Sequence, residues 1–149
     1  MARAGEHVDP VRVLEDLMRV DMDTLAAYQI ASGHLDDPDY KRQIEEFARE
    51  IEHHLEALRP EVTQLGGQPP EGPNAFEDRL LSAGFAIVDL TGDRSVLKAV
   101  RRRLKDAHSA YGRAAGLPEL QGDIHEFVAR AWGDADRQRR WLDATLRTM

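Results

Sequence analysis

The stretch EIEHHLEALRPEVTQLGG, residues 50–67, carries three structural signals in one segment. Its apolar residues recur every three or four positions, which is the period of a helix that buries one face. The closing Gly66-Gly67 pair is typical of a helix end, because glycine readily adopts the left-handed conformation needed there. Glu50 and His53 have the Glu-x-x-His spacing that can present a carboxylate and an imidazole to one metal ion. The stretch therefore predicts a long helix with one buried face and a candidate metal ligand.

The same helical period extends over most of the chain in both directions. Asp9-Pro10 predicts the start of the first helix, with Asp as N-cap and Pro at the first helical position. Pro60 is expected to kink or split the second helix, because proline lacks the backbone N–H. The clearest linker is GGQPPEGPN, residues 66–74. Helices are expected over residues 9–33, 37–67, 76–90 and 94–115, and from Pro118 to near the C-terminus.

Two helices, a long connection with a helix of its own and two further helices predict an all-α protein. We expect a four-helix bundle with an extra crossover helix between helices two and three, in a single domain of residues 1–149. The formal net charge of −7 is unfavourable for a general nucleic-acid partner, and the absence of cysteine excludes disulfides and thiolate metal sites. No long apolar run or N-terminal signal core is evident, so we expect no membrane association and a cytoplasmic location.

Asp21 is a candidate functional residue because it falls in the apolar face of the first helix. A buried, unpaired carboxylate costs several kcal/mol, so it needs either a metal ion or a partner. Asp21 could instead lie at the edge of that face and pair with an arginine. In the second helix, Glu50 and His54 are four residues apart and flank the apolar face, whereas His53 points further outward. The alternative for this pair is a surface ion pair with a histidine at the edge of the core.

The chain resembles the ferritin-like proteins, the group that includes rubrerythrin and bacterioferritin. Asp21 and Tyr28 match the family's first-helix pattern of an acidic residue, six residues and a tyrosine. The family's metal-binding histidine stands about eleven residues before the Leu of a terminal Leu-Gly-Gly, which places it at His54 rather than His53. The family's glutamate then falls on Ile51.

The second half of the chain departs further from the family pattern. Tyr111 is present, but Leu104 stands where the third-helix carboxylate is expected, and Ala135 and Gln138 stand where the last helix has Glu-x-x-His ahead of a Trp-Leu. The resemblance thus implies a degenerate di-metal site in which only Asp21 and His54 remain of six ligands. We expect these two side chains to meet each other, Gln138 or a tyrosine hydroxyl by hydrogen bonds.

The resemblance implies a ferritin-like protein of unassigned role, possessing no functional di-iron centre and no cofactor, with a connection to stress responses by analogy. One alternative is an iron- or manganese-binding oxidoreductase-like protein that uses Asp21, Glu50 and His54 as ligands. Another is a helical protein-interaction module, and enzymatic activity is left open. We also expect a homodimer with the crossover helix near its interface, because that helix has more apolar residues than one side can bury: Phe76, Leu80, Phe85 and Ile87.

Overall fold

The computed structural model describes residues 8–70, 75–87 and 89–149, apart from the side chains of Ala75 and Phe85. Within these ranges every regular element is a helix, which confirms the prediction of an all-α protein. In the described part of the chain no helix combines the length and apolar character needed to cross a membrane. The helices are α1 (Pro10–Ser32), α2 (Pro38–Gln64), α3 (Ala75–Ile87), α4 (Asp93–Ala115) and α5 (Asp123–Thr148).

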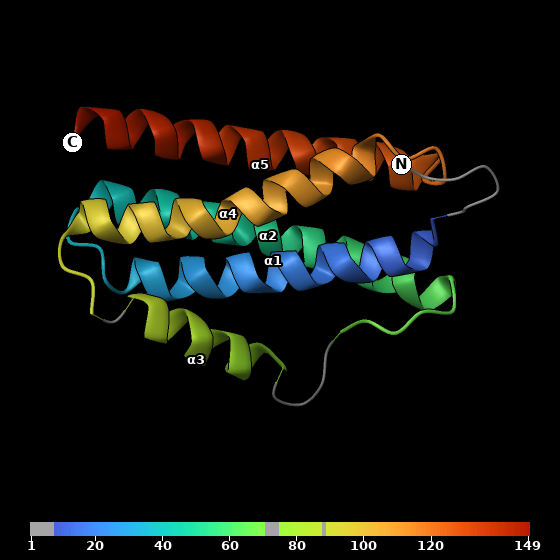
Figure 1. Ribbon diagram of the computed structural model, residues 1–149, viewed down its shortest axis with the longest axis horizontal. Helices are drawn as coiled ribbons and strands as arrows, with labels where there is room; N and C mark the ends of the chain where they lie inside the picture. Colours follow the sequence, from blue (N-terminus) through green and yellow to red (C-terminus); the bar gives the residue numbers. More distant parts are fainter. Residues whose placement is uncertain (1–7, 71–74, 88) are drawn as a thin grey trace.

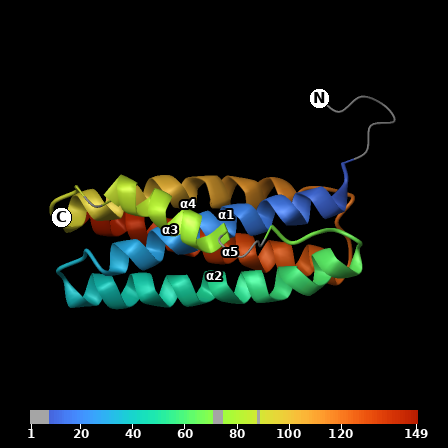
Figure 2. The ribbon, with the colours of Figure 1, turned by 90° about the horizontal axis from the view of Figure 1, so that it is seen from below.

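Four long helices lie side by side along one axis, and α3 lies outside them (Figures 1 and 2). The pairs α1–α2 and α4–α5 are antiparallel hairpins, and α1 also packs on α4. The end of α2 and the start of α4 lie at opposite ends of the bundle, so the connection that contains α3 runs back along its length (Figure 1). On the way α3 packs mainly against α1. This is the predicted four-helix bundle with a crossover helix.

Aspartate side chains fix the starts of the first two helices and the entry to the second hairpin. Asp9 caps α1 by accepting a hydrogen bond from Val11 N at 3.0 Å, and Asp37 caps α2 by accepting one from Asp39 N at 2.8 Å. Asp93, at the start of α4, accepts from Asp36 N at 2.8 Å and from Asp37 N at 3.0 Å. The loop between α1 and α2 is thereby tied to the beginning of α4.

The Gly66-Gly67 pair ends α2 in the way that the sequence predicts. Gly66 has φ of 84°, and the Gly66 and Gly67 amides donate to the carbonyls of Thr63 and Val62 at 3.1 and 2.9 Å. This pairing is a Schellman motif, which satisfies carbonyls at the end of the helix. A Cβ at Gly67 would lie 2.3 Å from Val11 Cγ1 of α1. Both glycines are therefore required, the first by its backbone conformation and the second by its close approach to α1.

Two details of the predicted helices are corrected by the structure. Of the kink or split expected at Pro60, the structure excludes the split, because α2 continues from Pro38 to Gln64. Since Pro60 is exposed and lies in the last two turns, the missing N–H affects little of the helix. The last helix begins at Asp123 instead of Pro118. The intervening residues form turns, with Leu120 N donating to Leu117 O, and Gly122 supplies a positive φ of 68° just before α5.

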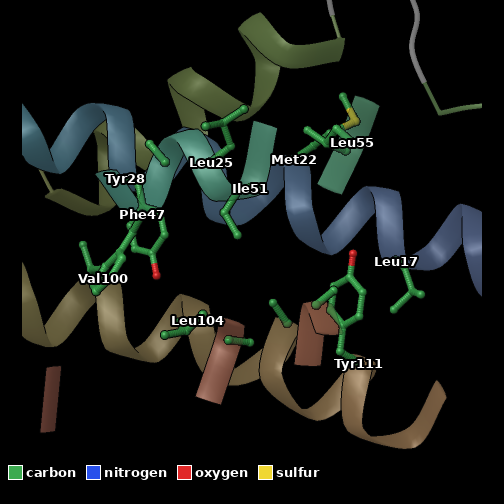
Figure 3. Close-up of a cluster of buried hydrophobic side chains, with 14 of the residues drawn as sticks. Leu17, Met22, Leu25, Tyr28, Phe47, Ile51, Leu55, Val100, Leu104 and Tyr111 are labelled. Atoms are coloured by element: carbon green, nitrogen blue, oxygen red, sulfur yellow. The ribbon is translucent and has the colours of Figure 1, made fainter. Parts of the chain in front are cut away.

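A continuous apolar core fills the space between the four long helices. Figure 3 shows part of this core, where side chains from α1, α2 and α4 converge. An edge-to-face aromatic chain runs from Tyr40 to Trp141 and on to Phe47, with ring centroids 6.0 and 5.6 Å apart. The core thus joins the two hairpins on both sides of the polar residues that the sequence singles out.

Candidate functional site

The two adjacent histidines of α2 have opposite environments. His54 is 4% exposed, whereas His53 is on the solvent side of the helix. His54 shares its face of α2 with the buried residues Phe47, Ile51 and Leu58, as the helical period requires. The inward-facing histidine is therefore the one that stands eleven residues before the Leu of Leu-Gly-Gly, as the family pattern implied. The Glu50-x-x-His53 pair does not face the bundle interior.

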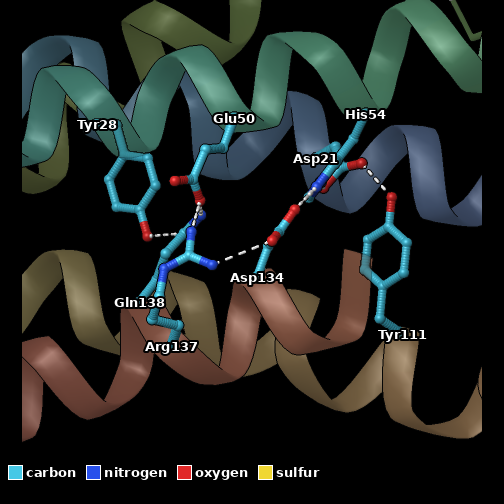
Figure 4. A network of polar contacts seen from close by, with 8 residues as sticks. All are labelled: Asp21, Tyr28, Glu50, His54, Tyr111, Asp134, Arg137 and Gln138. Carbon is cyan, nitrogen blue, oxygen red and sulfur yellow. Dashed lines mark hydrogen bonds and ion pairs between the residues drawn. The ribbon is translucent and has the colours of Figure 1, made fainter. Parts of the chain in front are cut away.

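Asp21 of α1 is fully buried and faces both α4 and α2 (Figure 4). Tyr111 of α4 donates its hydroxyl to Asp21 Oδ2. The other oxygen, Asp21 Oδ1, lies 3.9 Å from His54 Nδ1, and neither of these two atoms has a hydrogen-bond partner in the described part of the chain. The alternative in which Asp21 pairs with an arginine at the edge of the core is wrong, because its neighbours are a phenol and an imidazole.

The principal partner of His54 is Asp134 of α5, which sequence reasoning did not identify. The distance from His54 Nε2 to Asp134 Oδ2 is 2.9 Å, and Arg137 donates to Asp134 Oδ1 at 3.1 Å. Asp134 directly precedes Ala135, a buried residue, and therefore lies at the edge of the buried face of α5. This position beside the buried face could have identified Asp134 from the sequence, since a buried histidine needs a polar partner.

Glu50 also pairs with α5 rather than with His54 on its own helix. Arg137 donates to Glu50 Oε1, and Gln138 Nε2 donates to the same oxygen at 2.9 Å. Gln138 in turn accepts a hydrogen bond from the Tyr28 hydroxyl at 2.7 Å. The surface ion pair between Glu50 and His54 that the sequence allowed is replaced by contacts that cross between helices.

These contacts join into one continuous series of polar side chains, some buried and some exposed, which we call the interhelical network (Figure 4). It includes residues of α1, α2, α4 and α5, so that each long helix contributes at least one polar side chain. Its order is Tyr28, Gln138, Glu50, Arg137, Asp134, His54, Asp21 and Tyr111. The network ties the two hairpins together across the centre of the bundle.

The electrostatics of the network favour a protonated histidine. Burial by itself lowers the pKa of His54, but the hydrogen bond to Asp134 and the neighbouring Asp21 outweigh it and raise the pKa to about 9. The bond with His54 lowers the pKa of Asp134. Burial raises the pKa of Asp21 against the opposing effects of His54 and Tyr111.

The four other positions at which the ferritin-like pattern has metal ligands are all within the core. Each is 2% exposed or less: Ile51, Leu104, Ala135 and Gln138. Ile51 and Leu104 are among the apolar side chains that converge in Figure 3. Within residues 8–70, 75–87 and 89–149, no group of three or more His, Cys, Asp or Glu side chains is arranged to hold a metal ion.

The crossover topology gives this chain the fold of a ferritin-like bundle. A solved structure of a two-domain protein from Anabaena variabilis, with DJ-1/ThiJ/PfpI-like and ferritin-like domains, is similar over 97% of this chain, with a TM-score of 0.74 and 18% identity. The chain spans 41% of that protein. Residues 9–116 match the family described as Domain of unknown function (DUF2383), and the chain belongs to this family.

Two further results of the comparisons bear on the site. No curated protein matches the sequence. The family match ends at Gly116, so it includes Asp21, Glu50, His54 and Tyr111 but not α5. The three network residues of α5, Asp134, Arg137 and Gln138, which are partners of His54 and Glu50, therefore lie outside the matched residues.

Proposed function

We propose that this protein is a ferritin-like bundle that works without a functional di-iron centre. In this proposal the interhelical network holds the two hairpins together, and activity toward other molecules resides on the outer surface. The observation that carries the proposal is the His54 Nε2 to Asp134 Oδ2 hydrogen bond of 2.9 Å. It engages the histidine that the ferritin-like pattern would assign to iron. The proposal includes a role in stress responses, and this part rests on the resemblance to the ferritin-like family.

The donor set supports the same proposal. A metal ion binds the neutral imidazole, whereas His54 has a pKa raised to about 9 and is protonated at neutral pH. Bridged di-iron centres require several carboxylates and two histidines. Ile51, Leu104 and Ala135 offer no donor atom, and Gln138 already bonds Tyr28 and Glu50. These residues do not fit a di-iron centre.

One observation favours a second candidate, a protein that binds a single iron or manganese ion. Asp21 Oδ1 and His54 Nδ1 are buried, lack hydrogen-bond partners among the described residues and are 3.9 Å apart. An ion at about 2.1 Å from each atom could lie between them. Glu50 could become a third ligand only by leaving Arg137 and Gln138, so this candidate requires the network to open.

Elemental analysis distinguishes the two candidates. We expect protein purified without a histidine tag to contain far less than one equivalent of iron, manganese or zinc, and a chelator to leave its thermal unfolding unchanged. One equivalent of tightly bound metal, lost in both Asp21→Ala and His54→Ala but retained in His53→Ala, would overturn the proposal in favour of the single-ion site.

We also propose that the protein forms a homodimer through the outer face of α3. Leu81 on this helix is 63% exposed, which supports an apolar contact there. Of the four apolar residues that the sequence suggested for the interface, Ile87 is buried within its own chain, and the Phe85 side chain lies outside the described residues. Light scattering at micromolar concentration is expected to give twice the monomer mass, and Leu81→Glu is expected to give the monomer. A monomeric unmodified protein would exclude the dimer.

A further inference from the structure

A groove between α4 and α5 gathers positive charge in a protein whose formal net charge is −7. Its volume is about 670 Å³, within the range of small-molecule binding sites. Asp143 is the one carboxylate among its eight lining residues. Five of the eight are cations: Lys98, Arg101, Arg102, Lys105 and Arg139. The groove is formed by side chains that take no part in the interhelical network.

The charges of the groove are only partly neutralised within the protein. Asp143 is shared between Arg101 at 3.4 Å and Arg139 at 3.6 Å. The other three groove cations, Lys98, Arg102 and Lys105, form no ion pair in the part of the chain that the structure describes. They follow one another at spacings of four and three residues, at which like charges on a helix repel and destabilise it. A bound anion would remove that repulsion.

The positive surface continues around α4 beyond the groove. A second cavity of about 410 Å³ shares Lys98 and Arg102 with the first and adds Arg103 and one carboxylate, Asp106, on the side that faces the end of α3 and the following loop. At the opposite end, His108 lines the groove and its ring lies 6.1 Å from the ring of Trp132, which is 41% exposed. The groove is therefore a continuous basic strip with an accessible aromatic ring near one end.

The geometry points to an oligophosphate chain as the ligand of this groove, either free or as the phosphate tail of a nucleotide. Lys98 and Lys105 are seven residues apart on α4, which is about 10 Å at 1.5 Å per residue. A single small anion would meet only one or two of the cations, whereas a row of phosphates meets all of them. Arginine also binds phosphate oxygens in a bidentate manner, which favours a phosphate ligand at Arg101, Arg102 and Arg139.

A calorimetric titration with inorganic triphosphate tests this inference. We expect one site per chain at low ionic strength, with affinity that falls as salt is added. The double variant Arg102→Glu/Lys105→Glu should raise Kd by more than about tenfold, since loss of one charge-assisted hydrogen bond alone has that effect. The matched control is Lys41→Glu/Arg49→Glu, which changes the net charge equally on exposed positions of α2 and should leave Kd within about twofold.

The outcomes are distinguishable. Absence of binding to the unmodified protein, or equal weakening by both double variants, would overturn the inference, because the second result indicates diffuse charge attraction. Equal affinity for a hexaglutamate peptide would also overturn it in favour of an acidic protein segment. Adenosine triphosphate provides the remaining comparison: tighter binding than triphosphate, with a change in tryptophan fluorescence lost in Trp132→Phe, would identify a nucleotide, and equal binding would identify the phosphate chain alone.

Discussion

The variant His54→Ala is expected to lower the free energy of unfolding by about 3 to 5 kcal/mol, the range measured when one partner of a buried ion pair is removed. His54 is almost completely buried, bonds Asp134 at 2.9 Å and faces Asp21 at 3.9 Å. Without the imidazole, Asp21 keeps only the Tyr111 hydroxyl, and Asp134 keeps only Arg137. Chemical denaturation monitored by circular dichroism would measure the loss.

The neighbouring histidine supplies the matched control. His53→Ala changes the same residue type one position away on the same helix, but His53 is exposed. Its substitution should change the free energy of unfolding by less than about 0.5 kcal/mol, as is usual for surface positions. If the two variants were equally destabilised, the loss would not be specific to the interhelical network. If His53→Ala alone were destabilised, the register of α2 derived from Leu-Gly-Gly would be wrong.

A second variant tests whether the interaction is a pair across helices. Asp134→Asn retains the size of the side chain and removes its negative charge, so it weakens the bond to His54 without creating a cavity. In a double-mutant cycle with His54→Ala, residues in direct contact are expected to be non-additive by about 0.5 to 3 kcal/mol. Additive losses would show that Asp134 stabilises α5 only through Arg137.

The sequence was sufficient to predict the fold because its main signals are local. Asp-Pro at the start of α1 and Gly-Gly at the end of α2 specify helix ends by backbone chemistry alone. The start of α5 was misplaced because Pro118 is a good first helical residue and because the turns that occupy residues 116–122 depend on Gly122, whose positive φ is not signalled by the helical period.

The site was only half predictable for a related reason. Asp21 and His54 were found because a polar residue in an apolar period is visible within one helix. Asp134 was missed because its role depends on the packing of α5 against α2, which relates residues 80 positions apart. The long-range pairing of Glu50 with Arg137 was hidden in the same way, since the local spacing of Glu50 and His54 suggested a pair within α2. Helical periodicity specifies which face is buried but not which facing helix supplies the partner.

The stability of the protein is expected to fall as the pH rises from 6.5 to about 9. The pKa of His54 is about 9 in the folded protein, against 6.5 for an unperturbed histidine. The folded state therefore binds more protons than the unfolded state across this range, and its advantage is lost as the pH rises through the folded pKa. The difference between the two values corresponds to a loss on the order of 3 kcal/mol. Denaturation curves at pH 6 and pH 10 would measure it.

The other titratable groups of the network do not oppose the loss of stability expected between pH 6.5 and about 9. The lowered pKa of Asp134 adds stability that is present above the unfolded pKa near 3.8 and lost in more acidic solution, so it is constant between pH 6.5 and 9. The raised pKa of Asp21 acts in the same direction as His54, since a group that holds its proton more tightly when folded also loses stability as the pH rises. The part of the loss that His54 causes should be absent in His54→Gln, so that the total loss is smaller there, whereas the full loss should persist in His53→Gln. In Asp134→Asn the loss should be smaller and should be complete at a lower pH, because the hydrogen bond to Asp134 contributes most to raising the folded-state pKa of His54. A profile that is flat in the unmodified protein would mean that His54 is neutral when folded, which would leave its Nδ1 lone pair available and restore the case for a metal ion between His54 and Asp21.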